Sequence, residues 1–345
     1  MKKSLLALAV LGVFASAASA QSSVTLSGRL DAGLIRSSTP AKWIMDGSQS
    51  GYNNFTISGR EDLGGGMNAF FAMNHRFSIQ SGGIRSAAGV FWRNIWVGLG
   101  GGFGDVRLGR VLMPLQDMNG GFDAFDTGTV GSVHTGGITA TIRAHNAIYY
   151  RSPSMGGLSI HAAIAASDGQ LQAETANNFG NVAPTARFPT GERPTGFNVR
   201  YAAGPLNIGA AWDKNAADIK TTGFYASYDF GAIKPMFQYE KGDSSRTSPT
   251  CIGCSTLEEM KNMSFGATAP MGPVLIRAGY VRVDSNIAGR DGSKLGFGGD
   301  YSLSKRTYLY SNVGKFRGDR FKNGLLENNP NKTDTMFDIG VNHKF

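Results

Sequence analysis

The chain has 345 residues, of which 48 are glycine, roughly twice the average share, while charged residues make up only 17 % against about 25 % in a typical soluble domain. Hydrophobic residues make up 41 %, which excludes a collagen-like or disordered chain because enough apolar surface is available to bury. The net charge of +9 leaves nucleic acid, anionic lipid and small anions open as partners.

The first twenty residues have the pattern of a secretory signal peptide. Lys2 and Lys3 form a positive start, Leu5 to Phe14 an apolar stretch, and Ala18-Ser19-Ala20 a small-residue cleavage site. The apolar stretch is shorter than the about 20 residues that a membrane-spanning helix needs. We therefore expect residues 1–20 to be removed and residues 21–345 to form a single domain.

Apolar and polar residues alternate in the segments that follow. In the first of them, Val24, Leu26 and Leu30 share one parity and Thr25 and Arg29 the other, which is the period of a strand with one apolar and one polar face. No run of 18 uncharged apolar residues occurs beyond residue 20. Further alternating segments lie at 54–58, 67–76 and 105–109, and near 157–166, 194–202, 205–214, 220–230, 232–241, 261–270, 273–283, 293–303, 306–317 and 334–345.

Tight connections alternate with long ones between these segments. The short ones include EDLGGG at 61–66 and GGFG at 101–104, and the long ones lie at 36–51, 79–89, 112–142, 167–193, 242–260, 284–292 and 318–333. Outer-membrane barrels have short periplasmic turns and longer extracellular loops, whereas a secreted two-sheet sandwich, the alternative, gives no reason for this asymmetry. The pattern predicts an all-β fold, a 16-stranded antiparallel transmembrane β-barrel that encloses an aqueous channel.

Other motifs give no catalytic, cofactor or metal site. Cys251 and Cys254 form a single CIGC pair, which lacks the further ligands of a zinc site and favours a small loop disulfide in an oxidising compartment. The five histidines have no metal-ligand spacing. The glycine strings lack the strand-to-helix context of a phosphate-binding loop. We therefore expect no cofactor and no metal.

Five segments together resemble the trimeric general porins of Gram-negative bacteria, most closely the betaproteobacterial type. They are SSVTLSGRLDAGL, EDLGGGMNAFFAM, WRNIWVGLGGGFGDVRLGR, NAIYYRSPSMGGLSI and the terminal FDIGVNHKF, and the likeness spans the whole mature chain. The resemblance implies a third loop that folds into the barrel and narrows it, here Leu112 to Ile142. It also implies a multi-pass homotrimer in the bacterial outer membrane, surrounded by lipid and lipopolysaccharide, with no nucleic-acid partner.

The resemblance further implies a constriction between wall arginines and loop carboxylates. Arg29, Arg93 and Arg143 match the basic positions of the first, fourth and sixth strands, while Asn54 stands where the second strand usually has arginine. The alternation places Arg76 and Arg107 on the polar parity of their strands, where they can compensate. The loop carboxylates expected opposite these arginines are Asp117, Asp123 and Asp126.

The last residue, Phe345, ends an apolar stripe that includes Phe337, Ile339 and Val341. In outer-membrane proteins, similar strands are recognised by the barrel assembly machinery. We therefore expect Phe345 to act as an assembly signal, a role compatible with a place in the aromatic girdle.

Guanidinium groups stay charged at any relevant pH, and rings of charged side chains tune the selectivity of pores. We expect an outer-membrane porin, a water-filled channel for passive diffusion of small hydrophilic solutes and inorganic anions, with weak anion selectivity. The alternative is a substrate-specific channel for small organic anions such as carboxylates. An enzyme is disfavoured because no Ser and His arrangement marks a nucleophile with its base, and an adhesive barrel because its loops would dominate the chain.

Overall fold

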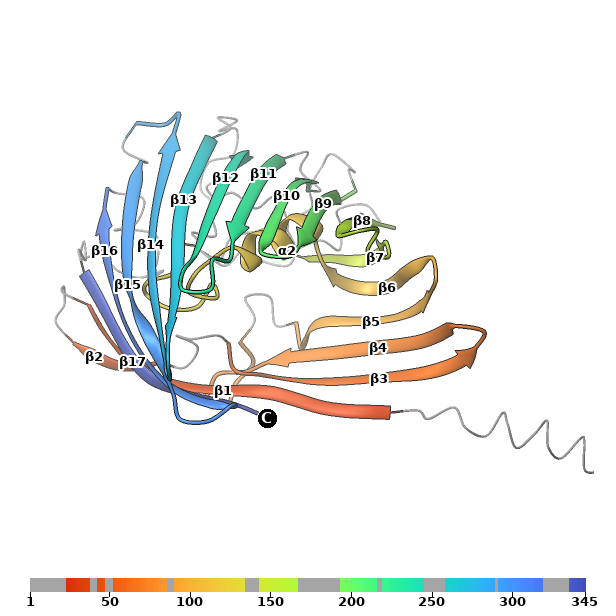
Figure 1. Ribbon diagram of the computed structural model, residues 1–345, viewed down its shortest axis with the longest axis horizontal. Coiled ribbons are helices and arrows are strands. Elements are labelled where there is room, and N and C mark those ends of the chain that lie inside the picture. Colours follow the sequence, from red (N-terminus) through yellow and green to blue (C-terminus); the bar gives the residue numbers. More distant parts are fainter. Residues whose placement is uncertain are drawn as a thin grey trace, which may run out of the picture.

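The computed structural model describes residues 23–37, 42–46, 52–85, 90–133, 143–166, 193–215, 219–244, 258–288, 291–318 and 335–345. These residues form one antiparallel sheet that closes on itself (Figure 1). Its strands are β1 (Ser23–Ser37), β2 (Trp43–Asp46), β3 (Asn54–Gly64), β4 (Met67–Arg76), β5 (Trp92–Gly101), β6 (Gly104–Leu112), β7 (Arg143–Arg151), β8 (Leu158–Ala165), β9 (Thr195–Ala203), β10 (Leu206–Lys214), β11 (Lys220–Tyr228), β12 (Lys234–Ser244), β13 (Glu258–Met271), β14 (Val274–Ser285), β15 (Gly292–Ser302), β16 (Thr307–Arg317) and β17 (Thr335–Lys344).

The barrel closes between its first and last strands, because Arg29 to Ser37 of β1 pair with Lys344 to Met336 of β17. On its other edge β1 pairs with two segments. Its C-terminal part, Gly33 to Arg36, pairs with β2, and its N-terminal part, Ser23 to Arg29, pairs with β3. β2 and β3 therefore occupy one strand position, interrupted between them, and the 17 segments make a 16-stranded barrel. The predicted fold class and strand number are confirmed.

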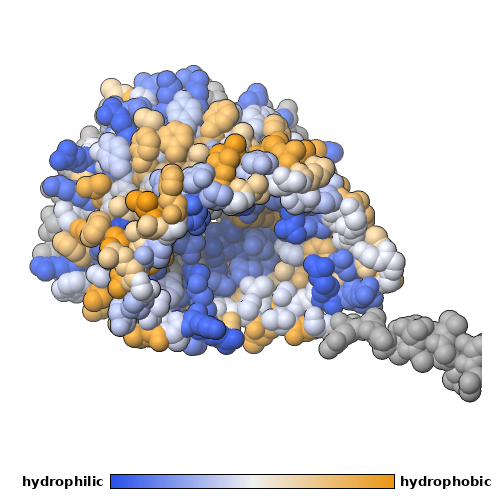
Figure 2. Space-filling view, viewed as in Figure 1, coloured by the Kyte–Doolittle hydropathy of each residue, from blue (hydrophilic) through white to orange (hydrophobic). Residues whose placement is uncertain are grey.

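The alternation in the sequence becomes the two faces of the wall. On β1, Val24 and Leu26 are 71 % and 62 % exposed on the outside, whereas Asp31 and Ile35 are buried on the inside. Figure 2 shows the result from one side of the molecule: hydrophobic residues on the outer surface surround a hollow lined with hydrophilic residues. A barrel with this outer face can be solvated by lipid while its lumen holds water.

The strands are joined by tight turns on one rim of the barrel and mostly by longer connections on the other. In the tight β3–β4 turn, Gly64, Gly65 and Gly66 all have positive φ angles, a region that residues with a Cβ rarely adopt, and Asp62 Oδ1 accepts a hydrogen bond from Gly64 N at 2.8 Å. One connection on the opposite rim is also short, since β10 ends at Lys214 and β11 begins at Lys220. The connection from β14, which ends at Ser285, to β15, which begins at Gly292, is no longer than the β7–β8 turn, so the alternation of short and long connections is not strict.

The helix α2 (Pro114–Gly121) follows β6 and lies inside the ring of strands, beside β8 to β11 (Figure 1). Pro114 lies in the first turn of α2, where backbone N–H groups have no partner within the helix. The N–H that proline lacks therefore costs no helical hydrogen bond. Among the described residues, no helix has the length and hydropathy needed to cross a membrane.

Candidate functional site

The helix α2 is fixed at its N-terminal end to the inner wall. Asn198 Nδ2 on β9 donates to Pro114 O at 2.9 Å, and the buried Asp213 on β10 accepts from Leu115 N at 3.4 Å. Leu115, Met118 and Phe122 then pack on Ala211 and Tyr225 of the wall. The apolar side of a short helix is in this way buried against the lumen face of the sheet.

Glu240, a buried residue of β12, holds the other end of the helix. Its carboxylate accepts hydrogen bonds from Asn119 Nδ2 on α2, from Tyr225 OH at 2.8 Å and from Asn262 Nδ2 at 3.1 Å. A buried carboxylate is costly unless it is hydrogen bonded, and here its donors include the loop itself. Displacement of α2 would therefore remove one hydrogen bond from this buried carboxylate.

The segment after α2 crosses to another sector of the wall. Val130 N donates to Asp338 Oδ2 on β17 at 2.9 Å, and Lys294 Nζ on β15 donates to Ser132 O. Val130 and Val133 join a buried hydrophobic cluster with residues of the wall, namely Ile35, Met260, Val281, Val283, Phe316 and Met336. Residues 113–133 therefore lie within the lumen and contact its wall at two separated places.

Several wall glycines provide room for this segment. A Cβ on Gly209 would collide with Met118, one on Gly296 with Gly131, and one on Gly314 with Val130. The absence of side chains on the inner face lets the loop backbone lie directly on the sheet. The high glycine content noted above therefore has a structural use beyond the turns.

Arg29, Arg76 and Arg93 gather around Tyr52 on the wall formed by β1, β3, β4 and β5. The Cζ atoms of Arg76 and Arg93 lie 3.8 Å and 5.7 Å from the centroid of the Tyr52 ring. Arg29, Tyr52 and Arg76 line one cavity together. The structure thus brings together three of the arginines expected at the constriction.

Arg93 reaches the lumen because of an irregularity in β5. Asn74 pairs with Asn94 and His75 with Trp92, so Arg93 is an extra residue on its strand. A β-bulge of this kind redirects side chains. It explains how Arg93 lies near Tyr52 although its neighbour Asn94 also lines the lumen.

Arg143 and Arg107 lie further along the same wall. Arg143 Nε donates to Asn94 Oδ1 at 2.6 Å. Arg107 Nε donates to Asp105 Oδ1 at 2.8 Å, and its Cζ lies 4.7 Å from the Trp96 ring. The charge of Arg107 is thus compensated locally by an acidic neighbour on its own strand.

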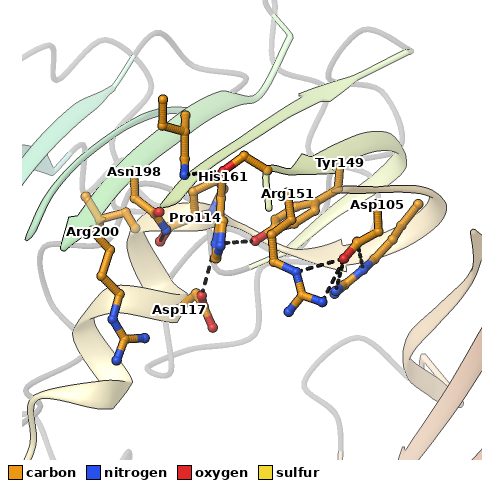
Figure 3. A network of polar contacts seen from close by, with 12 residues as sticks. Asp105, Pro114, Asp117, Tyr149, Arg151, His161, Asn198 and Arg200 are labelled. Carbon is orange, nitrogen blue, oxygen red and sulfur yellow. Dashed lines mark hydrogen bonds and ion pairs between the residues drawn. The ribbon is translucent and has the colours of Figure 1, made fainter. Parts of the chain in front are cut away.

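The three loop carboxylates have different surroundings. Asp126 Oδ2 lies 3.4 Å from Arg29 Nη1, with 62 % of its side chain exposed. Its φ of +53° lies in the left-handed region that non-glycine residues rarely adopt. Asp117, with 44 % of its side chain exposed, faces His161 Nδ1 at 3.5 Å, and His161 also contacts Tyr149 OH at 2.9 Å (Figure 3).

Asp123, the third expected carboxylate, is hydrogen bonded within the loop. It is 6 % exposed, and its oxygens accept hydrogen bonds from Phe125 N at 2.9 Å, from Val133 N at 3.4 Å and from Ser132 Oγ. These bonds tie the loop to itself because all of the donors belong to residues 125–133. The carboxylate of Asp123 is thus buried within the loop, unlike the exposed carboxylates of Asp117 and Asp126, and its expected place opposite the arginines stays a prediction.

Four of the five arginines, namely Arg29, Arg76, Arg107 and Arg143, and the two exposed loop carboxylates line adjoining cavities. Asn54 and Arg76 are common to both cavities. The first is also lined by Asn74, Asn94, Trp96, Arg107, Asp117, Arg143 and Tyr149, and the second by Arg29, Tyr52, Asp126, Thr127 and Lys344. Cationic guanidiniums on the wall therefore share polar spaces with carboxylates on the loop.

Sequence reasoning did not single out Tyr52, His161 or Glu240. Tyr52 follows a long polar stretch without strand alternation, and the role of Glu240 depends on contacts with residues far away in the chain. His161 occupies an inner position of an alternating segment, which indicates that it faces the lumen but not that it meets Asp117.

Cys251, Cys254 and the predicted signal peptide lie outside the described residues. Among the residues that the structure does describe, no three His, Cys, Asp or Glu side chains could hold a metal ion together.

The terminal residue Phe345 is paired with β1. Phe345 N donates to Gly28 O at 3.0 Å, and Gly28 N donates to Phe345 O at 2.9 Å. The Phe345 ring lies over Gly28, since a Cβ there would collide with it. The last residue thus completes the seam at which the barrel closes.

Comparisons with known proteins agree with this architecture. The sequence profile of a family described as Gram-negative porin matches residues 7–320. Outer membrane porin protein 32 of Delftia acidovorans is 32 % identical over 338 residues, covering 91 % of this chain and 89 % of the relative. An outer membrane porin protein of Bordetella pertussis is 28 % identical, with 100 % of both chains covered.

Solved structures show the same fold. The anion-selective porin from Comamonas acidovorans superimposes with a TM-score of 0.77 at 24 % identity, covering 94 % of this chain and 100 % of that one. The trimer form of OmpT from Vibrio cholerae has a TM-score of 0.66 at 14 % identity, covering 94 % and 99 %.

Proposed function

The chain belongs to the family of Gram-negative porins, channel proteins of the outer membrane, and from this premise we propose that its lumen arginines make it a weakly anion-selective general diffusion channel. The residues proposed to set the selectivity are Arg29, Arg76, Arg93, Arg107 and Arg143 on the wall, with Asp117 and Asp126 on the loop.

The observation that carries the proposal is the imbalance of charge around the two cavities. Leaving aside Arg107, which is paired with Asp105, the wall contributes Arg29, Arg76 and Arg143, whereas the loop contributes two exposed carboxylates, Asp117 and Asp126. Guanidiniums remain ionised at any relevant pH. The lumen at this level therefore has an excess of fixed positive charge, which concentrates anions and repels cations. A related barrel described as an anion-selective porin supports this reading.

Reversal potentials across a planar bilayer test the proposal. In ~0.1 M salt the Debye length is about 10 Å, so the field of the arginines extends across the cavities, while in ~1 M salt it is about 3 Å. We expect chloride to be preferred over potassium in a tenfold KCl gradient at low concentration, with the preference fading as salt rises. Equal permeability at low salt, or a preference for potassium, would contradict the proposal.

A channel selective for small carboxylates is the second candidate. The cavity that contains Arg76 and Arg143 is also lined by the amides of Asn54, Asn74 and Asn94. Guanidinium and amide N–H groups are the donors that carboxylates accept. Malonate should then block the chloride current in a concentration-dependent way, whereas nitrate at equal ionic strength should not. This difference would favour a carboxylate channel over a general one.

We propose the same assembly as in the trimeric members of the family. Closure between β1 and β17 leaves no free sheet edge, so contacts between copies must use side chains of the apolar outer face. The protomer would be surrounded by outer-membrane lipid and lipopolysaccharide and inserted by the barrel assembly machinery after removal of residues 1–20. Light scattering of the detergent-solubilised protein should give three times the protomer mass, and a protomer mass under every mild condition would contradict a trimer.

A further inference from the structure

Tyr52 lies where the second strand position is interrupted. β2 ends at Asp46 and β3 begins at Asn54, and Tyr52 precedes β3 by two residues. The neighbouring Asn53 fixes this segment to β1, because Asn53 Oδ1 accepts from Asp31 N at 2.6 Å and Asn53 Nδ2 donates to Asp31 O at 3.0 Å. The peptide after Tyr52 is thus held against the wall.

Three guanidiniums lie near the ring of Tyr52. The Cζ atoms of Arg76, Arg93 and Arg85 lie 3.8, 5.7 and 5.5 Å from the centroid of its ring. Arg76 belongs to β4 and Arg93 to β5, and Arg85 follows the end of β4. A single ring therefore contacts cations from three different places in the chain.

The face of an aromatic ring is electrostatically negative and attracts a cation within about 6 Å. Guanidiniums held near one another repel each other, and their long side chains have many rotamers available. A tyrosine ring among them lowers this repulsion without adding a negative ion that would compete with a passing anion. It keeps the arginines close together and adds no negative charge of its own.

We propose that Tyr52 is a positioning residue for the anion path, which holds Arg76, Arg85 and Arg93 in a compact cationic group beside the cavity. Tyr52 lines that cavity together with Arg29, Arg76 and Asp126. The inference rests on the proposed function and extends it, because it assigns the arrangement of the arginines to an uncharged residue on the interrupted strand.

The test compares Tyr52→Leu with Tyr52→Phe in planar bilayers. Leucine removes the ring, so the arginines lose their common partner, and the ratio of chloride to potassium permeability at low salt should fall about twofold. Phenylalanine keeps the ring face, so its ratio should remain close to that of the parent. Tyr228→Leu is the matched control, because Tyr228 on β11 is exposed on the outer face and its ring packs near Phe230, away from this group.

A double-mutant cycle separates positioning from a general loss of structure. In an Arg76→Gln background, Tyr52→Leu should change the permeability ratio much less than in the parent, because the nearest guanidinium is gone. Heat-modifiable migration of the folded barrel on gels shows whether each variant has folded, and Tyr52→Trp gives a second ring-bearing variant if Tyr52→Phe assembles poorly.

The outcomes distinguish this inference from the proposed function. A parent channel without anion preference would contradict the proposed function. A selective parent whose folded Tyr52→Leu variant has the same ratio would overturn the role of Tyr52, as would equal losses in Tyr52→Leu and Tyr52→Phe, because the ring face would then not be the cause.

Discussion

Asn54 on β3 and Arg76 on β4 are direct cross-strand partners. Asn54 stands where the resemblance to porins implies an arginine on the second strand, and the guanidinium of Arg76 lies beside it, on the next strand. Both residues line both cavities. The positive charge that is missing at one position of the wall is thus supplied from the position opposite.

This relationship predicts the outcome of an exchange. Arg76→Gln should lower the chloride preference at low salt, because it removes the guanidinium shared by the two cavities. Adding Asn54→Arg to Arg76→Gln should restore most of the preference, since the charge returns to the adjacent position on the same face of the sheet. Reversal potentials of the parent, of Arg76→Gln and of the double variant measure the chloride preference of each. If Asn54→Arg restores none of the preference, the exact position of the charge matters.

A second prediction concerns Arg93 and Arg143. Replacing both by glutamine should reduce the chloride preference in dilute KCl while the barrel stays folded, because lumen substitutions tune selectivity more than stability. The difference from the parent should vanish near 1 M salt, where the Debye length is about 3 Å. If the double variant matches the parent at every salt concentration, these two arginines do not control the ion path.

The loop carboxylates provide a third, internally controlled prediction. Asp117→Asn and Asp126→Asn should each raise the chloride preference, because each removes an exposed negative charge from a cavity, and Asp126→Asn should change the free energy of unfolding by less than about 0.5 kcal/mol. Asp123→Asn is the matched control, since its carboxylate is buried within the loop.

Asp123→Asn should instead destabilise the loop by about 1–3 kcal/mol, because buried donors lose a charged acceptor. Thermal melting in detergent and reversal potentials measure the two effects separately. A large selectivity change in Asp123→Asn, with none in Asp117→Asn or Asp126→Asn, would contradict this assignment.

The contact between Glu240 and α2 leads to a fourth prediction. Glu240→Ala removes the common acceptor of Asn119, Tyr225 and Asn262, so the helix should be held less firmly and the single-channel conductance should become larger and noisier. The exposed Glu259 gives the control substitution Glu259→Ala. Unchanged conductance and open-channel noise in a folded Glu240→Ala protein would mean that the other wall contacts suffice to hold the loop.

The seam between Gly28 and Phe345 gives a fifth prediction. Gly28→Val should reduce the amount of assembled protein, as deletion of Phe345 should, because a side chain at Gly28 would displace the terminal ring and strain the pairing of the first and last strands. Gly102→Ala is the control, since a Cβ there meets no other atom within 4 Å. Normal outer-membrane levels of both Gly28→Val and the truncated chain would count against a role of this contact in assembly.

Much of the wall could be predicted from the sequence because the alternation of apolar and polar residues is a local property. The segments expected at 205–214, 273–283 and 306–317 agree with β10, β14 and β16 to within two residues at either end. The interruption of the second strand between β2 and β3 was not predicted, because β2 (Trp43–Asp46) is too short to show alternation and its pairing with β1 depends on register.

The site was less predictable, for reasons that particular residues show. Arg93 lies in the lumen because of a bulge, and a single extra residue is invisible to a pattern of period two. Asp123 and Asp126 are three residues apart in the same polar loop, yet one is buried and the other is exposed, because the loop turns between them. Tyr52 lies near Arg76, Arg85 and Arg93 only because the folded wall brings these distant parts of the chain together.

The segment that crosses the lumen also has a mechanical consequence. A tube made of one layer of strands resists stretching along its hydrogen bonds far better than it resists being flattened. Residues 113–133 are bonded to β9, β10 and β12 near one end and to β15 and β17 near the other. They therefore act as an internal cross-brace, so that lateral pressure from the membrane changes the cross-section of the tube only if these contacts are stretched or broken.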